Sequence, residues 1–183
     1  MEVVPRLRGR FGRPFTYVER CASTQRLLDG APEGAVAAAG EQTEGRGRLG
    51  RTWDAPAGTS LLFSIVLAPP VPPARLPELS LVAGTAVAEA IESETRLHAT
   101  VKHPNDVLVE GRKVAGILAE ATEGRVVLGI GVNVSQTEPQ LPTRTATSLA
   151  IEGATVDRAE LLAAILERLE RHYDSWITSS SDT

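Results

Sequence analysis

The run ATVKHPNDVLVEGRKVAGILAEATEGRVVLGIGVNV, residues 99–134, contains successive apolar segments of strand length with short connections between them. Two connections are the dipeptides Glu110-Gly111 and Glu123-Gly124, which are typical of tight turns between paired strands. Strands joined in this way lie side by side and antiparallel, so this half of the chain is predicted to form a meander. The predicted strands are residues 99–102, 107–109, 113–120 and 126–134.

The rest of the chain supplies further strands and two long helices. Asp157-x-x-Glu160 resembles a capping box at the start of the last helix, and Ser23 or Thr24 is expected to cap a short one. The expected elements are strands at 15–19, 36–39 and 60–67, a short helix at 26–28, and amphipathic helices at about 77–94 and 157–173. This order predicts an α+β domain with a mixed, mainly antiparallel central sheet flanked by helices.

The length of 183 residues suits one domain with short terminal extensions. We expect the domain to span residues 15–178, between a flexible basic lead at 1–14 and a polar tail at 179–183. The lead carries four arginines among glycines and prolines, which would also suit an arm that contacts phosphates. Because chain termini are commonly loose, a solvated lead is the preferred interpretation.

The composition argues against several classes of protein. A net charge of −4 disfavours a general nucleic-acid binder, and no apolar run has the length needed to cross a bilayer. The single cysteine, Cys21, rules out an intrachain disulfide and fits a reducing cytoplasm. The three histidines and the cysteine lack the spacing of a metal site. We therefore expect a cytoplasmic protein with neither nucleic acid nor membrane as a partner.

A second stretch points to a ligand. Residues 40–53, GEQTEGRGRLGRTW, hold three glycines and three arginines between Gly45 and Arg51 and end on Trp53. Glycine lets backbone N–H groups approach a ligand closely, and arginine offers a fixed fork that matches carboxylate and phosphate oxygens. The stretch is predicted to be a mobile cationic lid over an anionic small molecule. A nucleic-acid contact is the alternative, although it would need a broader basic surface than this acidic chain suggests.

Four separated motifs resemble those of the biotin protein ligase family. Gly45–Trp53 is similar to GRGRxGRxW, and Lys102–Asp106 with Lys113–Glu120 is similar to the block KWPND…KxxGIL(x)E. Ser23–Gln25 and Gly129–Asn133 resemble the family's S-T-N and G-x-G-x-N segments. The resemblance implies the catalytic-domain fold of that family, which is related to class II aminoacyl-tRNA synthetases.

The resemblance runs from about Tyr17 to Trp176 and implies an ATP-dependent biotin ligase. In this family the biotin carboxylate attacks the α-phosphate of ATP, so pyrophosphate leaves and biotinyl-5'-adenylate forms. A lysine of the biotin carboxyl carrier domain of acetyl-CoA carboxylase, or of a related carboxylase, then attacks this mixed anhydride and AMP leaves. Mg²⁺ is expected to accompany ATP. Relatives often dimerise through an exposed sheet edge, so a homodimer is one option.

The resemblance also assigns roles to residues. Lys102, Arg48 and Asp106 are expected to be catalytic; Asp106 is also the candidate Mg²⁺ ligand or the group that deprotonates the incoming lysine. The expected biotin contacts are Ser23, Thr24, Gln25, Gln42, Gly45, Arg46, Gly47, Arg48, Lys102 and Gly116. The expected ATP contacts are Arg51, Trp53, Asn105, Lys113 and Asn133. Cations suit this chemistry because a carboxylate and a triphosphate must be brought together.

Structural roles stay open for several of these residues. Ser23 and Thr24 would also serve as helix caps, Gly116 would also allow close packing, and Trp53 would also anchor the core. Glu120, at the end of its strand, is interpreted as a solvated or salt-bridging carboxylate.

The chain also departs from the family pattern. His103 stands where most relatives have tryptophan, and a tolerated change is the preferred interpretation. The chain is expected to be a short form that lacks both an N-terminal DNA-binding domain and the C-terminal SH3-like barrel, which weakens the expectation of efficient carrier transfer more than that of biotin adenylation. A lipoate or octanoate ligase-like transferase and a non-catalytic biotin-binding or sensing protein remain alternatives.

Overall fold

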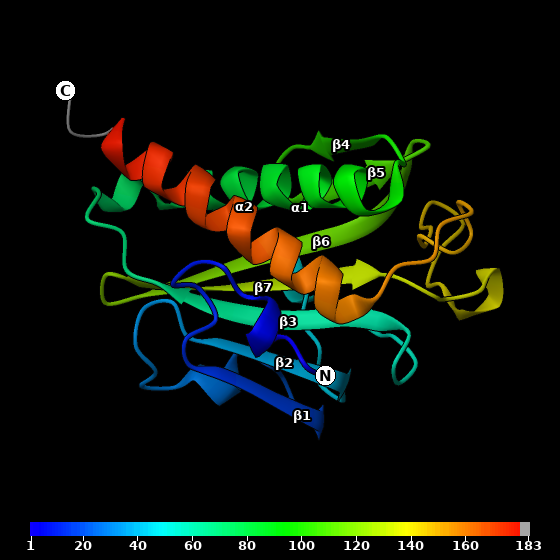
Figure 1. Ribbon diagram of the computed structural model, residues 1–183, viewed down its shortest axis with the longest axis horizontal. Coiled ribbons are helices and arrows are strands. Elements are labelled where there is room, and N and C mark those ends of the chain that lie inside the picture. Colours follow the sequence, from blue (N-terminus) through cyan, green and yellow to red (C-terminus); the bar gives the residue numbers. More distant parts are fainter. Residues whose placement is uncertain (180–183) are drawn as a thin grey trace.

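The computed structural model describes residues 1–179, so the predicted polar tail lies outside the described residues apart from Ser179. It contains one seven-stranded sheet with two long helices on the same side of it (Figure 1). The strands are β1 Phe15–Cys21, β2 Val36–Gln42, β3 Ser60–Leu67, β4 Ala99–Lys102, β5 Asp106–Val109, β6 Arg112–Thr122 and β7 Arg125–Asn133. The α-helices are α1 Leu79–Thr95 and α2 Arg158–Thr178; five 3-10 turns are Val4–Arg6, Arg26–Leu28, Arg48–Gly50, Pro73–Glu78 and Glu138–Gln140.

The strand order is β1-β2-β3-β7-β6-β5-β4. β1 and β2 are parallel and every other neighbouring pair is antiparallel, which confirms the mixed, mainly antiparallel sheet. The predicted meander is confirmed as β4 to β7. Both of its predicted turns have two residues with positive φ, 51° and 74° at Glu110 and Gly111 and 51° and 79° at Glu123 and Gly124. These signs match the turn type whose twist suits a two-residue hairpin.

The main core lies between the helices and one face of the sheet. Strand side chains alternate between the two faces, and in β3 the residues Leu61, Phe63, Ile65 and Leu67 join the cluster that contains the apolar sides of α1 and α2. Burial of each such side chain stabilises the fold by about 1.5–3 kcal/mol. On the opposite face a smaller buried cluster consists of Leu28, Ala35, Ala37 and Val66. Elsewhere on that face, glycines of β6 and β7 leave room for a cleft.

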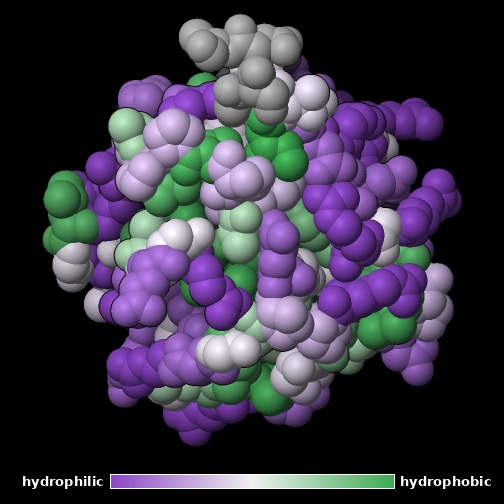
Figure 2. Space-filling view, turned by 90° about the vertical axis from the view of Figure 1, so that its left-hand side faces the viewer, coloured by the Kyte–Doolittle hydropathy of each residue, from purple (hydrophilic) through white to green (hydrophobic). Residues whose placement is uncertain are grey.

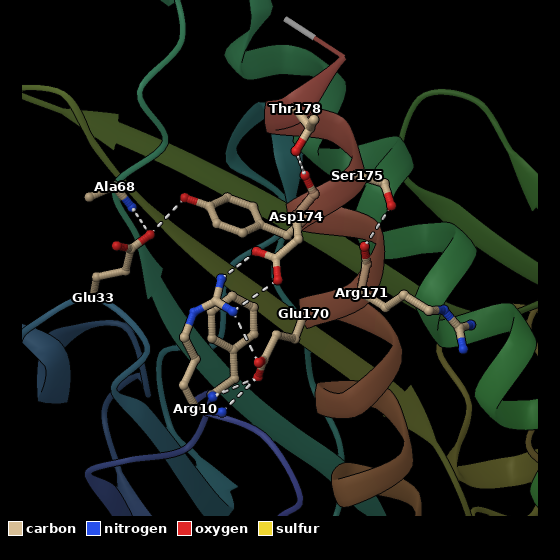
Figure 3. Close-up of polar contacts among 10 residues, drawn as sticks. Arg10, Glu33, Ala68, Glu170, Arg171, Asp174, Ser175 and Thr178 are labelled. Atoms are coloured by element: carbon tan, nitrogen blue, oxygen red, sulfur yellow. Dashed lines mark hydrogen bonds and ion pairs between the residues drawn. The ribbon is translucent and has the colours of Figure 1, made fainter. Parts of the chain in front are cut away.

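The basic lead is not loose, contrary to the expectation for residues 1–14. Val3, Leu7 and Phe11 are buried in the main core. Arg10 lies against α2, where its guanidinium pairs with Glu170 at 3.0 Å and Asp174 at 2.5 Å (Figure 3). These carboxylates hold the pKa of Arg10 above its usual range, Asp174 chiefly through a hydrogen bond. The lead is ordered because three apolar side chains and one ion-pair network anchor it.

The helix boundaries show what the sequence pattern could resolve. α2 begins where predicted, because the Asp157 side chain accepts hydrogen bonds from the backbone N–H groups of Ala159 and Glu160 at 2.8 and 3.0 Å. α1 begins later than predicted because the 3-10 turn Pro73–Glu78 precedes it. The prediction that Ser23 or Thr24 caps the 26–28 turn is wrong, since that turn has no side-chain cap.

Within the described residues, no helix combines the length and apolar character needed to cross a membrane. On the face of the molecule drawn in Figure 2, apolar residues lie in small groups between charged and polar ones. A broad apolar surface of the kind that marks a large protein interface is not visible on that face.

Candidate functional site

A cleft of about 310 Å³ lies on the sheet face opposite the helices. This volume is at the lower end of the range for small-molecule pockets, roughly 300–1,000 Å³. Neighbouring residues of β6 show which face it is. Ile117 reaches towards Gly84 of α1, whereas Gly116 lies under Trp53 on the other side of the sheet. The predicted site residues that line the cleft are Ser23, Thr24, Gln25, Gln42, Arg46, Gly47, Arg48, Arg51, Trp53, Lys102, Asn105, Asp106, Lys113 and Gly116.

Glycines form the floor of the cleft. Gly116 of β6 is paired with Gly131 of β7. A Cβ atom on Gly131 would lie 2.6 Å from Trp53 Cε2, and one on Gly116 would lie 2.9 Å from Trp53 Cζ3. A Cβ on Gly129 would lie 3.2 Å from Gln25 Nε2. Glycine at these positions therefore leaves the space that Trp53 and Gln25 occupy.

The predicted lid is a small hairpin above this floor. Arg46 and Thr52 form an isolated antiparallel bridge, and the 3-10 turn Arg48–Gly50 makes the tip. At the base, the Trp53 N–H donates to Gly45 O at 2.9 Å, and a Cβ on Gly45 would collide with the Trp53 carbonyl. Leu49 at the tip is 86% exposed. The lid is thus held at its base and open to solvent at its tip.

The indole of Trp53 covers the middle of the floor. Its Nε1 is buried and has no hydrogen-bond partner in the described part of the chain. Lys113 Nζ lies 5.6 Å from the ring centroid, within the range of a cation–π contact. The indole therefore faces the cleft rather than the helix-side core, and the core-anchor interpretation of Trp53 is not supported.

One wall of the cleft is a hydrogen-bonded polar group. The backbone N–H and the hydroxyl of Thr24 both meet Gln42 Oε1, at 2.8 and 3.0 Å. The Thr24 hydroxyl is also 2.7 Å from Ser64 Oγ. Because two donors converge on Oε1, the amide oxygen of Gln42 is fixed there and its NH₂ group is available to a ligand. The hydroxyl of Thr24 thus serves the cleft instead of a helix cap.

The opposite wall is cationic. The sequence has only two lysines among its 19 basic residues, and both Lys102 and Lys113 line the cleft. Lys102, at the end of β4, is exposed and makes no ion pair within the described residues. Lys113 Nζ lies 2.8 Å from Asp106 Oδ1. His103 is exposed beside them, at the edge of the same cleft.

Arg46 connects the lid to the end of β6. Its Nη2 lies 3.0 Å from Glu120 Oε2, and a longer contact of 3.4 Å reaches Gln25 Oε1. Glu120 is therefore a salt-bridging carboxylate, as one interpretation of the sequence held. Both side chains are more than a third exposed, so the pair is worth at most about 1 kcal/mol. A contact this weak would not by itself hold the predicted lid closed.

Two predicted nucleotide contacts have structural partners. Asn105 Nδ2 donates to Ile117 O at 2.9 Å, which ties the 102–106 turn to β6. Asn133 does not line the cleft; its Nδ2 donates to Thr147 O at 3.0 Å and its Oδ1 accepts from Gln136 at 2.9 Å. Gly45 also lies outside the cleft lining, although it shapes the base of the lid. The sequence pattern could not separate these supporting roles from ligand contacts.

Other residues of the cleft were not predicted. Ser64 completes the polar wall, and Gly129 and Gly131 complete the floor. A signal for all three is present in the strands. Ser64 interrupts the apolar run of β3, and glycines at alternate positions of β7 fall on one face of the sheet.

A wider groove of about 1070 Å³ lies next to the cleft and shares the lid with it. Its other side is formed by the 3-10 turn before α1, including Leu76, and by the end of β6, from Leu118 to Ala121. The lid therefore borders two spaces, a narrow polar cleft and a broad open groove.

Comparisons with known proteins agree with this geometry. The family model described as "Biotin/lipoate A/B protein ligase family" matches residues 15–136. The chain is 36% identical over 181 residues to the bifunctional ligase/repressor BirA of Bacillus subtilis, covering 91% of this chain and 56% of the relative. It is 38% identical over 152 residues to the biotin–[acetyl-CoA-carboxylase] ligase of Mycobacterium tuberculosis, covering 79% and 56%. The chain thus spans little more than half the length of these relatives.

Solved structures give the same result. A biotin protein ligase from Aquifex aeolicus in complex with biotin and ATP has a TM-score of 0.79 and 35% identity, over 91% of this chain and 72% of that one. A biotin protein ligase from Leishmania major in complex with biotinyl-5-AMP has a TM-score of 0.75 and 26% identity, over 92% and 80%. The mixed sheet with its two helices is the fold of these catalytic domains.

Proposed function

The chain belongs to the biotin/lipoate A/B protein ligase family, and we propose that it is an ATP-dependent biotin ligase. It activates biotin as biotinyl-5'-adenylate, with release of pyrophosphate. It then transfers the biotinyl group to a lysine of a biotin carboxyl carrier domain, with release of AMP. The observation that carries the proposal is the cleft itself, which joins a hydrogen-bonding wall to a wall that contains both lysines of the chain.

The polar wall suits the ureido ring of biotin. That ring offers one carbonyl acceptor and two N–H donors, and the wall presents hydroxyl and amide groups of both kinds. The proposed partners are the hydroxyls of Ser23 and Thr24 and the NH₂ group of Gln42, which makes no hydrogen bond in the part of the chain that the structure describes. Biotin would then extend along the glycine floor with its carboxylate towards the lysines.

The cationic wall suits the activation step. Lys102 has no competing ion pair among residues 1–179, so its ammonium is available to hold the biotin carboxylate against the α-phosphate and to stabilise the charge that develops there. Arg48 lines the cleft from the lid, and its side chain makes no hydrogen bond or ion pair within the described residues, although its backbone carbonyl accepts from the Arg51 N–H. We assign it to the phosphate of the adenylate. Arg51, Trp53 and Lys113 are the proposed neighbours of the nucleotide.

Mg²⁺ is proposed to arrive with ATP. The described residues contain no group of three or more histidine, cysteine or carboxylate side chains suited to a metal ion. Mg²⁺ usually binds through one or two carboxylates together with substrate phosphates and water, so Asp106 alone fits this mode. A bound Mg²⁺ would neutralise phosphate charge. In that role Asp106 would bind the ion with one carboxylate oxygen and give up part of its contact with Lys113. In the alternative role it would accept a proton from the carrier lysine.

The carrier domain is proposed to approach through the wider groove, since that groove opens on the other side of the lid. Displacement of the lid would then expose the carbonyl of the adenylate to the incoming amine. A homodimer and a cytoplasmic location, as expected from the sequence, remain predictions.

Isotope exchange between ATP and pyrophosphate tests the activation step. The protein is assayed with biotin, with lipoate and with neither. We expect exchange with biotin alone. Exchange with lipoate would assign the chain to the lipoate branch of the family, and tight binding of biotin without exchange would favour a sensor. Transfer of labelled biotin to a purified carrier domain then tests the second step.

A further inference from the structure

The backbone of Lys113 is held by a segment far along the chain. Its N–H donates to Thr145 O at 2.8 Å, and its carbonyl accepts from the N–H of Thr147 at 2.8 Å. Lys113 and Ala146 therefore form a parallel bridge, although residues 145–147 belong to no strand. The loop that follows β7 thus supports the first residues of β6.

The preceding residue, Arg112, binds the same loop through its side chain. Its Nη1 lies 3.0 Å from Glu138 Oε1, and its Nη2 lies 2.7 Å from Glu152 Oε1. The Thr147 hydroxyl donates to the same Glu152 oxygen at 2.5 Å. We name Arg112, Glu138, Thr147 and Glu152 the arginine clamp. The clamp joins the two ends of the loop between β7 and α2 to the start of β6.

Burial makes the clamp more than a surface ion pair. Thr147 is fully buried, the Glu152 side chain is 10% exposed and the Arg112 side chain is 31% exposed. Exposed ion pairs contribute little, whereas removal of one partner of a buried pair leaves an uncompensated charge. The hydrogen bonds that Arg112 donates to Glu138 and Glu152 also hold the pKa of Arg112 above its usual range. Loss of the guanidinium would therefore disturb Glu152 and the loop segment 145–147 beside Lys113.

We propose that Arg112 is a positioning residue for Lys113. Side chains of consecutive strand residues point to opposite faces. Arg112 therefore forms ion pairs with the loop, while Lys113 extends into the cleft towards Asp106 and Trp53. A lysine has a flexible four-carbon stem, and its ammonium is placed well only when its backbone is fixed. The inference rests on the proposed function, because it assigns Lys113 to the nucleotide. It adds that the loop between β7 and α2, through its ion pairs with Arg112, fixes the position of the Lys113 ammonium.

Two variants of the full chain test the clamp, with a matched control. Arg112→Gln removes both ion pairs. Glu138→Gln removes only the pair with the more exposed partner, so it is the milder variant and keeps the test valid if Arg112→Gln fails to fold. Arg171→Gln is the control because it removes a surface ion pair with Glu89, between the two long helices. We expect Arg112→Gln to lower kcat for biotin-dependent exchange by about tenfold to a hundredfold, as misplacement of a reacting group does. The KM for biotin should stay unchanged, since the polar wall is untouched.

A double-variant cycle separates positioning from general stabilisation. If Arg112 acts through Lys113, Arg112→Gln costs far less in a Lys113→Ala background than in the natural chain. An equal cost in both backgrounds would overturn the proposal. Arg112→Lys should restore part of the activity, because lysine keeps the charge but lacks the fork that reaches two carboxylates.

A second readout does not depend on activity. Labelling with ¹⁵N-lysine gives two backbone amide signals, from Lys102 and Lys113. We expect Arg112→Gln, and to a lesser degree Glu138→Gln, to accelerate hydrogen exchange at the Lys113 amide and leave Lys102 as in Arg171→Gln. Unchanged exchange at Lys113 would overturn the proposal. If the natural chain shows no biotin-dependent exchange between ATP and pyrophosphate, the proposed ligase function is wrong. The amide signals would still report whether Arg112 positions Lys113.

Discussion

Gly131→Ala is the substitution with the most direct consequence for the cleft. The added Cβ would lie 2.6 Å from Trp53 Cε2, 2.8 Å from Cζ2 and 2.9 Å from Nε1. Carbon atoms pack best at roughly 3.5–4.0 Å, so the indole must rise by about 1 Å. The strand will not move instead, because β7 is hydrogen-bonded on both sides, to β3 and β6. The φ of Gly131 is outside the positive range, so the effect is steric and carries no backbone strain.

The expected cost has two parts. Overpacking of this kind destabilises a fold by about 1–3 kcal/mol, and for a domain of this length each kcal/mol lowers the melting temperature by about 2–4 °C. The raised indole also narrows the cleft, so biotin affinity should fall by about tenfold, which corresponds to about 1.4 kcal/mol of binding free energy. Titration calorimetry with biotin and thermal unfolding measure the two effects.

The partner variant Trp53→Leu provides the control. It removes the three indole atoms that the new Cβ would meet, so Gly131→Ala should then cost little further stability. Natural biotin affinity and natural Trp53 fluorescence in the single Gly131→Ala variant would refute the placement of the indole on the glycine floor. Equal destabilisation with and without Trp53 would show that the methyl group clashes elsewhere.

Three further predictions concern the wall, the activation step and pH. Thr24→Val should cost about 1–3 kcal/mol in urea unfolding and weaken biotin binding, because it leaves buried polar partners unmatched; unchanged stability and affinity would contradict this. Lys102→Ala should lower kcat for exchange by at least tenfold with little change in melting temperature, since the side chain is exposed; natural kcat would remove it from the chemistry. Hydrogen bonds from Arg75, and then Trp176, lower the pKa of Glu78 from 4.5 to about 2. The resulting stability is present above pH 4.5 and lost as the pH falls towards 2, so acid titration of Glu78→Gln should show less loss in this window than the natural chain; identical titrations would contradict it.

The sheet was predictable because its signals are local. Alternating and continuous apolar runs located the strands, and Glu-Gly turns fixed the order of the meander. The lead was not predictable in the same way. Val3, Leu7 and Phe11 are buried only because α2 returns across them more than a hundred residues later, and Arg10 finds its carboxylates there. Tertiary contacts of this range leave no local pattern.

The site was predictable in part because its residues lie in recognisable motifs. Thr24, Gln42, Lys102 and Lys113 do line one cleft. The spacing of the motif could not show that the Asn133 side chain points away from the cleft. Its direction depends on hydrogen bonds with Gln136 and Thr147 in the loop that follows β7. The floor glycines were visible as residues but not as a surface, since the pairing of β6 with β7 is what brings them together.

Detection of the activated intermediate tests the central claim most directly. The protein is incubated with biotin, ATP and Mg²⁺ without any carrier domain, then denatured, and the released small molecules are analysed by mass spectrometry. The account predicts biotinyl-5'-adenylate in an amount close to that of the protein, with no corresponding adenylate when lipoate replaces biotin. Absence of biotinyl-5'-adenylate from protein that binds biotin would contradict the assignment of this cleft to biotin activation.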